Sequence, residues 1–236
     1  MRSLDFIENS YISIYKYLNS NMYILYKQNT VLVIDPHINE EIKTCFFDRN
    51  IRNVTIILTH EHSDHISGVW WFLENYECIL ICSENCSNII SDKKLTRPLF
   101  MYFFIKENNK KNGTNYFDQF KKEYVWTSYI ANITFFDEFK YEWQGHQLFF
   151  KAIQGHSIGS SYIILDNKYV FTGDSLIKDY PIIVNFPQSN KNIFLNETIP
   201  LLEKTLYSDM IILSGHGKTF VLSEIMKGKK INVEIR

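Results

Sequence analysis

The 236-residue chain has no long hydrophobic run and almost no net charge, and these absences exclude several classes of protein. No stretch approaches the roughly 20 apolar residues that a membrane-spanning helix needs. The N-terminal segment lacks the apolar core and small-residue cleavage site of a secretory signal. A net charge of -1 gives no general field that would attract a polyanion. We therefore expect a cytoplasmic protein with neither a membrane nor nucleic acid as its partner, and no pattern indicates an oligomeric state.

Cysteine is also scarce, with four residues at positions 45, 78, 82 and 86. The spacing of the last three matches neither the paired C-x2-C of zinc modules nor the usual iron–sulfur runs. A reducing compartment disfavours disulfides. We expect four buried free thiols, which is the commonest state of an unpaired cysteine.

The remaining composition, 45% hydrophobic and 22% charged, is ordinary for a globular protein, and residues 1–236 suffice for a single domain. Short apolar runs bounded by turn residues predict strands, and apolar residues at helical spacing predict helices. The predicted strands cover 22–27, 31–35, 54–58, 78–82, 148–153, 162–165, 169–172 and 210–213. The predicted helices cover 38–47, 66–73, a segment from about 83, 192–206 and 222–226. Strands mixed with helices throughout indicate a layered α/β fold.

Residues 95–131 do not fit this alternation, because they are aromatic and polar by turns with a Lys/Asn-rich middle. A structureless loop of this length is unusual in a compact domain. We interpret the segment as an inserted helical lid or pocket wall, with an ordinary surface excursion as the alternative. The aromatic residues within 100–105 and 116–126 either line an apolar pocket or form core.

A histidine-rich motif, Thr59-His60-Glu61-His62-Ser63-Asp64-His65, directly follows the buried strand predicted at 54–58. In extended backbone, residues two apart point the same way, so His60 and His62 can present two imidazoles to one metal ion. The chain then turns toward a helix, which directs Asp64 and His65 elsewhere, to a second metal ion beside the first. Imidazole and carboxylate ligands suit zinc, iron or manganese.

Three further potential ligands follow predicted strands, each beside a glycine: His156, Asp174 and His216. Glycine permits a sharp turn or a close approach of the backbone. In α/β proteins, ligand sites collect beyond the carboxyl ends of strands. The repeated order of strand, glycine and ligand therefore supports one site built from remote loops.

Together, His60-x-His62-x-Asp64-His65, His156, Asp174 and His216 resemble the motif series of the metallo-β-lactamase superfamily. The resemblance extends from Asn21 to Gly217 and includes 33–36, which is similar to the family's second strand. It implies a four-layer αβ/βα sandwich. It also implies that His60, His62 and His156 hold a first metal ion, that Asp64, His65 and His216 hold a second, and that Asp174 bridges both.

The residue at position 174 narrows the resemblance within the family. The true β-lactamases of this fold carry cysteine or serine there, whereas Asp174 is similar to glyoxalase II-type thioesterases and their lactonase and phosphodiesterase relatives. His62 differs from the glutamate of the flavodiiron branch. Only nineteen residues follow Gly217, and 177–190 lacks the Gly-Arg-x-Asp run of short relatives. We therefore do not expect a glutathione thioester as the specific substrate.

The expected activity is that of a binuclear metal-dependent hydrolase acting on a small thioester, ester or lactone. Two divalent ions, with Zn2+ expected and Fe or Mn as alternatives, can share a water and depress its pKa, so that a metal-bridging hydroxide becomes the nucleophile. Asp64 is the expected catalytic residue, because it can align that hydroxide or accept its proton. The alternatives are a phosphodiesterase using the same metals and a non-catalytic metal-bound protein that binds a small ligand.

The other polar residues near the motifs are expected to have supporting roles. Ser157 and Ser175 are interpreted as residues that orient ligands or form turns. A structural or solvent-exposed role is expected for His37 and His146. Asp35 is expected to be a buried, hydrogen-bonded support of the site.

Overall fold

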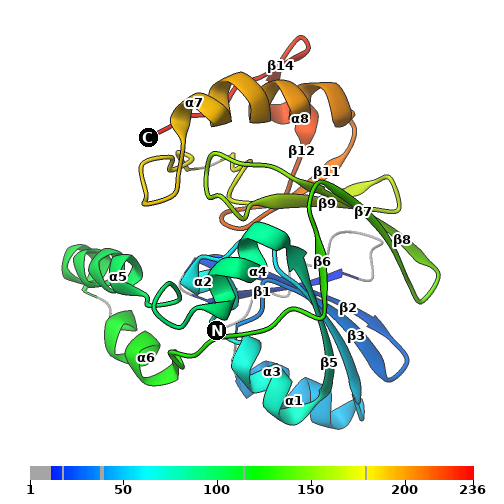
Figure 1. Cartoon of the computed structure of the whole chain (residues 1–236), viewed down its shortest axis with the longest axis vertical. Helices are drawn as coiled ribbons and strands as arrows, with labels where there is room; N and C mark the ends of the chain where they lie inside the picture. The colour runs from blue at the N-terminus through cyan, green and yellow to red at the C-terminus, as the bar shows by residue number, and fades with distance from the viewer. Residues whose placement is uncertain (1–11, 18, 38–39, 114, 179) are drawn as a thin grey trace.

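The computed structural model describes residues 12–17, 19–37, 40–113, 115–178 and 180–236, which form two six-stranded sheets (Figure 1). The first sheet contains β1 (Ile12–Tyr17), β2 (Ser20–Lys27), β3 (Thr30–Ile34), β4 (Asn53–Ile57), β5 (Glu77–Ser83) and β6 (Ile133–Phe135), in that order. The second contains β7 (Glu138–Trp143), β8 (His146–Ala152), β9 (Ser161–Leu165), β10 (Tyr169–Gly173), β11 (Ile211–Ser214) and β12 (Phe220–Val221), in the order β12-β11-β10-β9-β8-β7. A small hairpin follows, β13 (Met226–Lys227) with β14 (Lys230–Ile231).

Helices cover the outer surfaces of both sheets (Figure 1). Those beside the first sheet are α1 (Glu40–Asp48), α2 (Ser63–Ile66), α3 (Val69–Asn75) and α4 (Glu84–Ser91). The second sheet is covered by α7 (Lys191–Ile193), the π-helical turn η1 (Phe194–Thr198) and α8 (Ile199–Thr205). The 3-10 helix η2 (Leu222–Ile225) follows β12. This is the four-layer αβ/βα sandwich predicted from the sequence.

Alternation along the strands explains the layers, because successive side chains of a strand point to opposite faces of the sheet. In β2, Met22 and Ile24 pack beneath the helices, while Tyr23 and Leu25 face the second sheet. In β3, Val33 packs beneath the helices, while its neighbours Leu32 and Ile34 face the second sheet. With both faces buried, these strands have the continuous apolar runs seen in the sequence.

Several boundaries differ from the sequence prediction. The helix predicted at 66–73 is two short helices, and Gly68 lies at the break between them. A Cβ at Gly68 would lie 2.7 Å from the backbone of His37. Glycine at the break therefore allows the two backbone segments to approach this closely. The start predicted for 38–47 falls outside the described residues, and the predicted helix 222–226 is a 3-10 helix. Cys82 and Cys86 are buried, whereas Cys45 and Cys78 are half-buried, so the prediction of four buried thiols was wrong for two of them.

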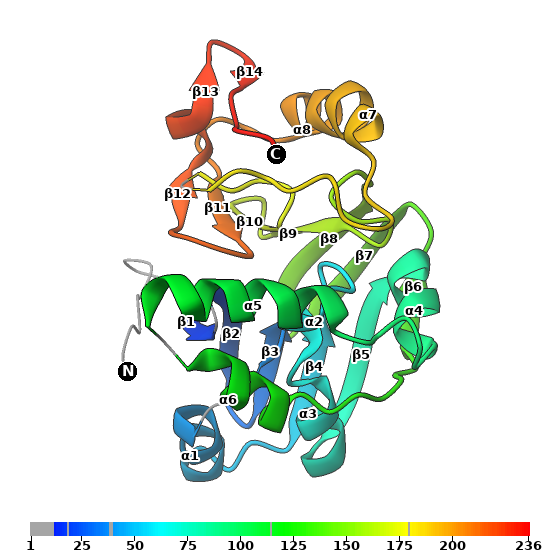
Figure 2. The ribbon, with the colours of Figure 1, turned by 90° about the vertical axis from the view of Figure 1, so that its left-hand side faces the viewer.

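The 95–131 segment contains two helices, α5 (Leu99–Asn112) and α6 (Tyr116–Glu123). They lie to one side of the two sheets (Figures 1 and 2). Ile105, Phe120 and Tyr124 form a small core between them. Tyr102 and Phe117 pack against this core, while Phe103 and Tyr116 are exposed to solvent. No helix in the described ranges has the length and hydropathy required to cross a bilayer.

Candidate metal centre

The seven residues predicted as metal ligands lie in one cluster just beyond the carboxyl ends of four strands. His60 and His62 follow β4, where His62 precedes the first residue of α2 and Asp64 and His65 belong to its single turn. The others follow β8, β10 and β11 and are His156, Asp174 and His216. Strand ends are where α/β folds collect ligand groups, because the backbone turns there and side chains converge.

One group of three imidazoles consists of His60, His62 and His156. One ring nitrogen from each lies within 4.8 Å of the others, and the His156 Nε2 to His62 Nδ1 distance is 3.0 Å. Three neutral imidazoles at this spacing form a ligand set typical of zinc.

A second group lies beside it and consists of Asp64, His65 and His216, again with ligand atoms within 4.8 Å of one another. Asp174 stands between the groups. Its Oδ2 lies 3.6 Å from His156 Nε2 and 3.3 Å from His216 Nε2, and its Oδ1 lies 3.5 Å from His65 Nε2. Asp174 therefore contacts a member of each group.

Hydrogen bonds through Asp35 fix which nitrogen of His60 and His65 faces the cluster. Thr59 donates its hydroxyl hydrogen to Asp35 Oδ2 at 2.6 Å, so its oxygen must accept the hydrogen on His60 Nδ1, at 3.0 Å. His65 Nδ1 donates to the same Asp35 oxygen at 3.0 Å. Both rings consequently direct Nε2 at the centre. Asp35 also accepts from the Thr59 amide, so it acts as the buried support that the sequence predicted.

Backbone carbonyls orient two further rings in the same way. His156 Nδ1 donates to the Ile183 carbonyl at 2.8 Å, and His216 Nδ1 donates to the Asn19 carbonyl at 2.7 Å. Each leaves Nε2 as the atom that faces the cluster. Such outer hydrogen bonds set the tautomer of a metal-binding histidine and hold the plane of its ring.

The unpaired atoms at the centre show that a cation fits it. Within the described residues, His60 Nε2, His65 Nε2 and Asp174 Oδ1 are buried without a hydrogen-bond partner. An unsatisfied buried polar atom costs about 1–3 kcal/mol, so three of them in one cluster indicate a partner that the protein itself does not supply. Imidazole nitrogens and carboxylate oxygens together match a divalent transition metal.

The electrostatics of the cluster lead to the same conclusion. Burial lowers the pKa of His62 to about 3 and holds the pKa of His60 well below its usual value, so both rings are neutral, as metal ligands must be. Burial also opposes protonation of His65, but Asp64 and Asp174 outweigh it and raise its pKa to about 9. A divalent cation would take the place of such a proton, because metal and proton compete for the same lone pair.

The residues predicted to have supporting roles lie around this cluster or away from it. Ser157 donates to Glu61 Oε2 at 3.1 Å, and the Ser175 amide closes a turn onto Thr172. His37 is fully buried with Nε2 3.2 Å from the Tyr15 carbonyl, and His146 pairs with Asp166 at the second sheet. These positions agree with structural roles.

Sequence reasoning missed several contributors to the site. Thr59 is the first residue of the motif, and its hydroxyl was a signal that could have been used. Glu61 is buried, and burial raises its pKa to about 7, but no role was predicted for it from the sequence. Asn19 and Ile183 contribute only carbonyl oxygens, for which no side chain gives a signal.

The cluster forms part of the floor of a cavity of about 720 Å³. His62, Asp64, Asp174 and His216 line it on one side. Apolar walls come from both halves of the chain and include Ile89, Leu95, Leu99, Met101, Ile177, Ile183 and Phe186. This volume is typical of a pocket for a small organic molecule.

Curated relatives with similar sequences are hydroxyacylglutathione hydrolases. The protein from Francisella philomiragia is 39% identical over 86 residues, which cover 34% of this chain and 30% of the relative. The one from Prochlorococcus marinus is 30% identical over 96 residues, which cover 40% of this chain and 36% of the relative. The chain thus spans about a third of the length of these relatives.

Solved structures share the fold at low sequence identity. The BLEG-1 B3 metallo-β-lactamase has a TM-score of 0.66 at 20% identity, covering 88% of this chain and 91% of that one. TTHA1623, solved in a di-iron-bound form, has a TM-score of 0.61 at 19% identity, covering 91% and 96%. Residues 16–216, which include all seven clustered residues, match the sequence profile of one family. The chain belongs to the metallo-β-lactamase superfamily.

Proposed function

We propose that this protein is a metal-dependent hydrolase that cleaves a small thioester, ester or lactone. The observation that carries the proposal is the convergence of five imidazoles and two carboxylates beside a cavity of about 720 Å³. Hydrogen bonds already orient four of the rings, and two ring nitrogens, His60 Nε2 and His65 Nε2, are unpaired, which is the arrangement of a site built to bind metal. The names of the curated relatives support hydrolysis of an acyl compound.

Two divalent ions would be held by the two groups of ligands. His60, His62 and His156 would bind the first, Asp64, His65 and His216 the second, and Asp174 would be shared. Zinc is the expected ion, with iron or manganese as alternatives. Such ions supply a water of lowered pKa and an electrophile for the oxygen of the attacked group. The chain itself holds the ligands rigid through Asp35, Thr59 and the two backbone carbonyls.

Asp64 is proposed to accept a proton during the reaction as well as to bind metal. The Asp64 side chain is 7% exposed and lines the cavity, and its Oδ2 lies 3.3 Å from His216 Nε2. We expect Asp64→Asn to lower turnover about 100-fold when assayed at saturating metal, because an amide cannot accept the proton. Steady-state kinetics with metal content measured in parallel test this. A variant that keeps both ions and full turnover would remove the proton role.

The insertion at 95–131 is proposed to serve as a wall or lid of the cavity within a single domain. Leu95, Leu99 and Met101 line the cavity next to Ile89 of α4. Tyr102, Phe117 and Phe120 pack together instead, so α5 and α6 form a unit of their own that presents its first turn to the cavity.

A panel of chromogenic substrates tests the proposed function. Metal-loaded protein is assayed against aryl thioesters, aryl esters, lactones and bis(p-nitrophenyl) phosphate, with chelated protein as the control. We expect turnover of at least one acyl substrate, lost on chelation and restored by zinc. A preference for the phosphodiester would favour the alternative reaction on the same metals. Tight ligand binding without any turnover would indicate a binding protein.

A further inference from the structure

We propose that the substrate carries an anionic group, a carboxylate or a phosphate monoester, that Lys94 and Arg97 bind at the rim of the cavity. Both residues line the same cavity as His62 and Asp174. The inference rests on the proposed function, because it names the chemical class of the molecule that this hydrolase would take.

The two cations have no carboxylate partner in the described part of the chain. Lysines elsewhere in the described part of the chain, such as Lys151, Lys178 and Lys230, do form ion pairs with carboxylates. Lys94 and Arg97 are largely exposed to solvent. Two adjacent uncompensated positive charges at the mouth of a pocket attract an anion and can donate charge-assisted hydrogen bonds to it.

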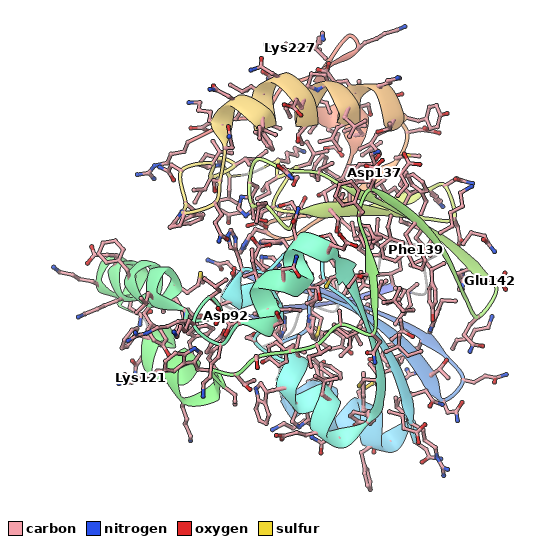
Figure 3. All side chains as sticks on the ribbon, in the orientation of Figure 1. Asp92, Lys121, Asp137, Phe139, Glu142 and Lys227 are labelled. Atoms are coloured by element: carbon pink, nitrogen blue, oxygen red, sulfur yellow. The ribbon has the colours of Figure 1, made fainter. Side chains whose placement is uncertain are left out.

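The turn that carries these cations is braced from both sides. Within the turn, Asp92 accepts hydrogen bonds from the amides of Lys94, Leu95 and Thr96. Asp92 lies where the α5–α6 pair joins the rest of the chain (Figure 3). The backbone at the rim is therefore ordered before any ligand binds, which lowers the entropy cost of binding.

A second set of contacts ties the turn to the segment after α6. Thr96 donates its hydroxyl to the Thr127 carbonyl at 2.8 Å, and Tyr124 donates to the Thr96 carbonyl. Trp126 donates its indole N–H to the Lys93 carbonyl. The Arg97 guanidinium and the Lys93 ammonium each lie 5.3 Å from the Trp126 ring centroid. The indole thereby supports Arg97 at the rim through a cation–π contact.

The distribution of charge along the cavity selects one kind of molecule. At the floor, the carboxylates of Asp64 and Asp174 face the imidazoles of His65 and His216. Much of the remaining lining is apolar, and Arg236 adds a third cation to it. A suitable substrate therefore has a reactive carbonyl at one end, an apolar middle and an anion at the other.

Calorimetry with inert analogues measures this preference without turnover. The probes are 6-(propylsulfanyl)hexanoate, its uncharged amide, and 6-(propylsulfanyl)hexyl phosphate, in which a thioether replaces the thioester. With metal-loaded protein at low salt, we expect at least one anion to bind about tenfold more tightly than the amide. The tighter of the two anions identifies carboxylate or phosphate as the group recognised. Equal affinity for all three probes would overturn the inference.

Variants separate the rim from the metals as the source of any anion preference. In the Lys94→Gln/Arg97→Gln double variant, we expect the ratio of anion to amide affinity to fall below about twofold. Lys93→Gln is the control for loss of charge in this turn, because it removes one positive charge, against two in the double variant, at a residue that does not line the cavity. It is expected to keep the preference. A preference that survives in the double variant, or that Lys93→Gln abolishes equally, would contradict the assignment.

The same proteins distinguish failure of this inference from failure of the proposed function. If the metal-loaded protein hydrolyses no thioester, ester or lactone but the binding ratio behaves as expected, the rim assignment stands and the proposed reaction fails. If thioesters are hydrolysed without regard to charge, and the binding ratio is one, the reaction stands and the rim assignment fails.

Discussion

Asp174→Asn is expected to remove at least one metal ion per chain and to lower turnover about 100-fold or more. Loss of a group that merely supports a ligand costs about 10–100-fold in metal affinity or activity, and Asp174 contacts members of both ligand groups directly. Asparagine has the same size as aspartate but no negative charge. The two proposed metal ions would therefore lose the anion that reduces their mutual repulsion. Elemental analysis and steady-state kinetics measure the two effects.

Asp166→Asn is the matched control for this prediction. Asp166 also contacts a histidine, His146, at 2.7 Å, but this pair belongs to the hairpins of the second sheet and not to the cluster. The control is expected to keep wild-type metal content and turnover. An Asp174→Asn protein with unchanged metal content and activity would show that Asp174 is not a shared ligand.

Gly215→Ala is expected to disable the second ligand group without replacing any ligand. A Cβ at this position would lie 2.3 Å from Asp174 Oδ1 and 2.7 Å from His65 Cε1, well inside van der Waals contact. The backbone cannot retreat, because the Gly215 amide donates to the Gly173 carbonyl and its carbonyl accepts from the Asn21 amide, both at 2.7 Å. Overpacking of this kind costs about 1–3 kcal/mol.

The clash should therefore move Asp174 and His65, and we expect metal content to fall from two ions to about one. Elemental analysis combined with thermal unfolding reports both consequences. Gly113→Ala is the control, because Gly113 has a left-handed φ of 65° but nothing within 4 Å of the added Cβ. It should lower stability by about 1 kcal/mol and leave the metals in place. Wild-type metal content in Gly215→Ala would contradict the close packing at the centre.

The central strands could be predicted from the sequence because burial on both faces produces apolar runs. This applies to β3, β4 and β10, whose predicted bounds differ from the observed ones by a residue or so. It does not apply to β7 (Glu138–Trp143), in which half-buried and exposed residues alternate at the edge of the second sheet. Its turn signal, Gln144-Gly145 with φ of 51° and 87°, was present but not used. The helix predicted at 192–206 corresponds to the continuous segment from α7 to α8. The π-helical turn within it, before Pro200, was not predicted.

The ligand residues could be proposed from spacing and resemblance because side-chain chemistry is written in the sequence. The hydrogen bonds that orient the rings could not, because a carbonyl oxygen such as that of Asn19 or Ile183 is common to every residue type. The cations at the rim were missed for another reason. Lys94 and Arg97 belong to a charged stretch with no motif that marks a binding site, and only the fold brings them to the cavity of His62.

The most direct test is to count and locate the metal ions in wild-type protein. Elemental analysis of protein produced with zinc, iron and manganese available, followed by anomalous diffraction, provides both. We predict two divalent ions per chain, one against His60 and one against His65, with Asp174 between them. Protein that takes up no transition metal, in crystals where these side chains stand too far apart to share an ion, would contradict the account.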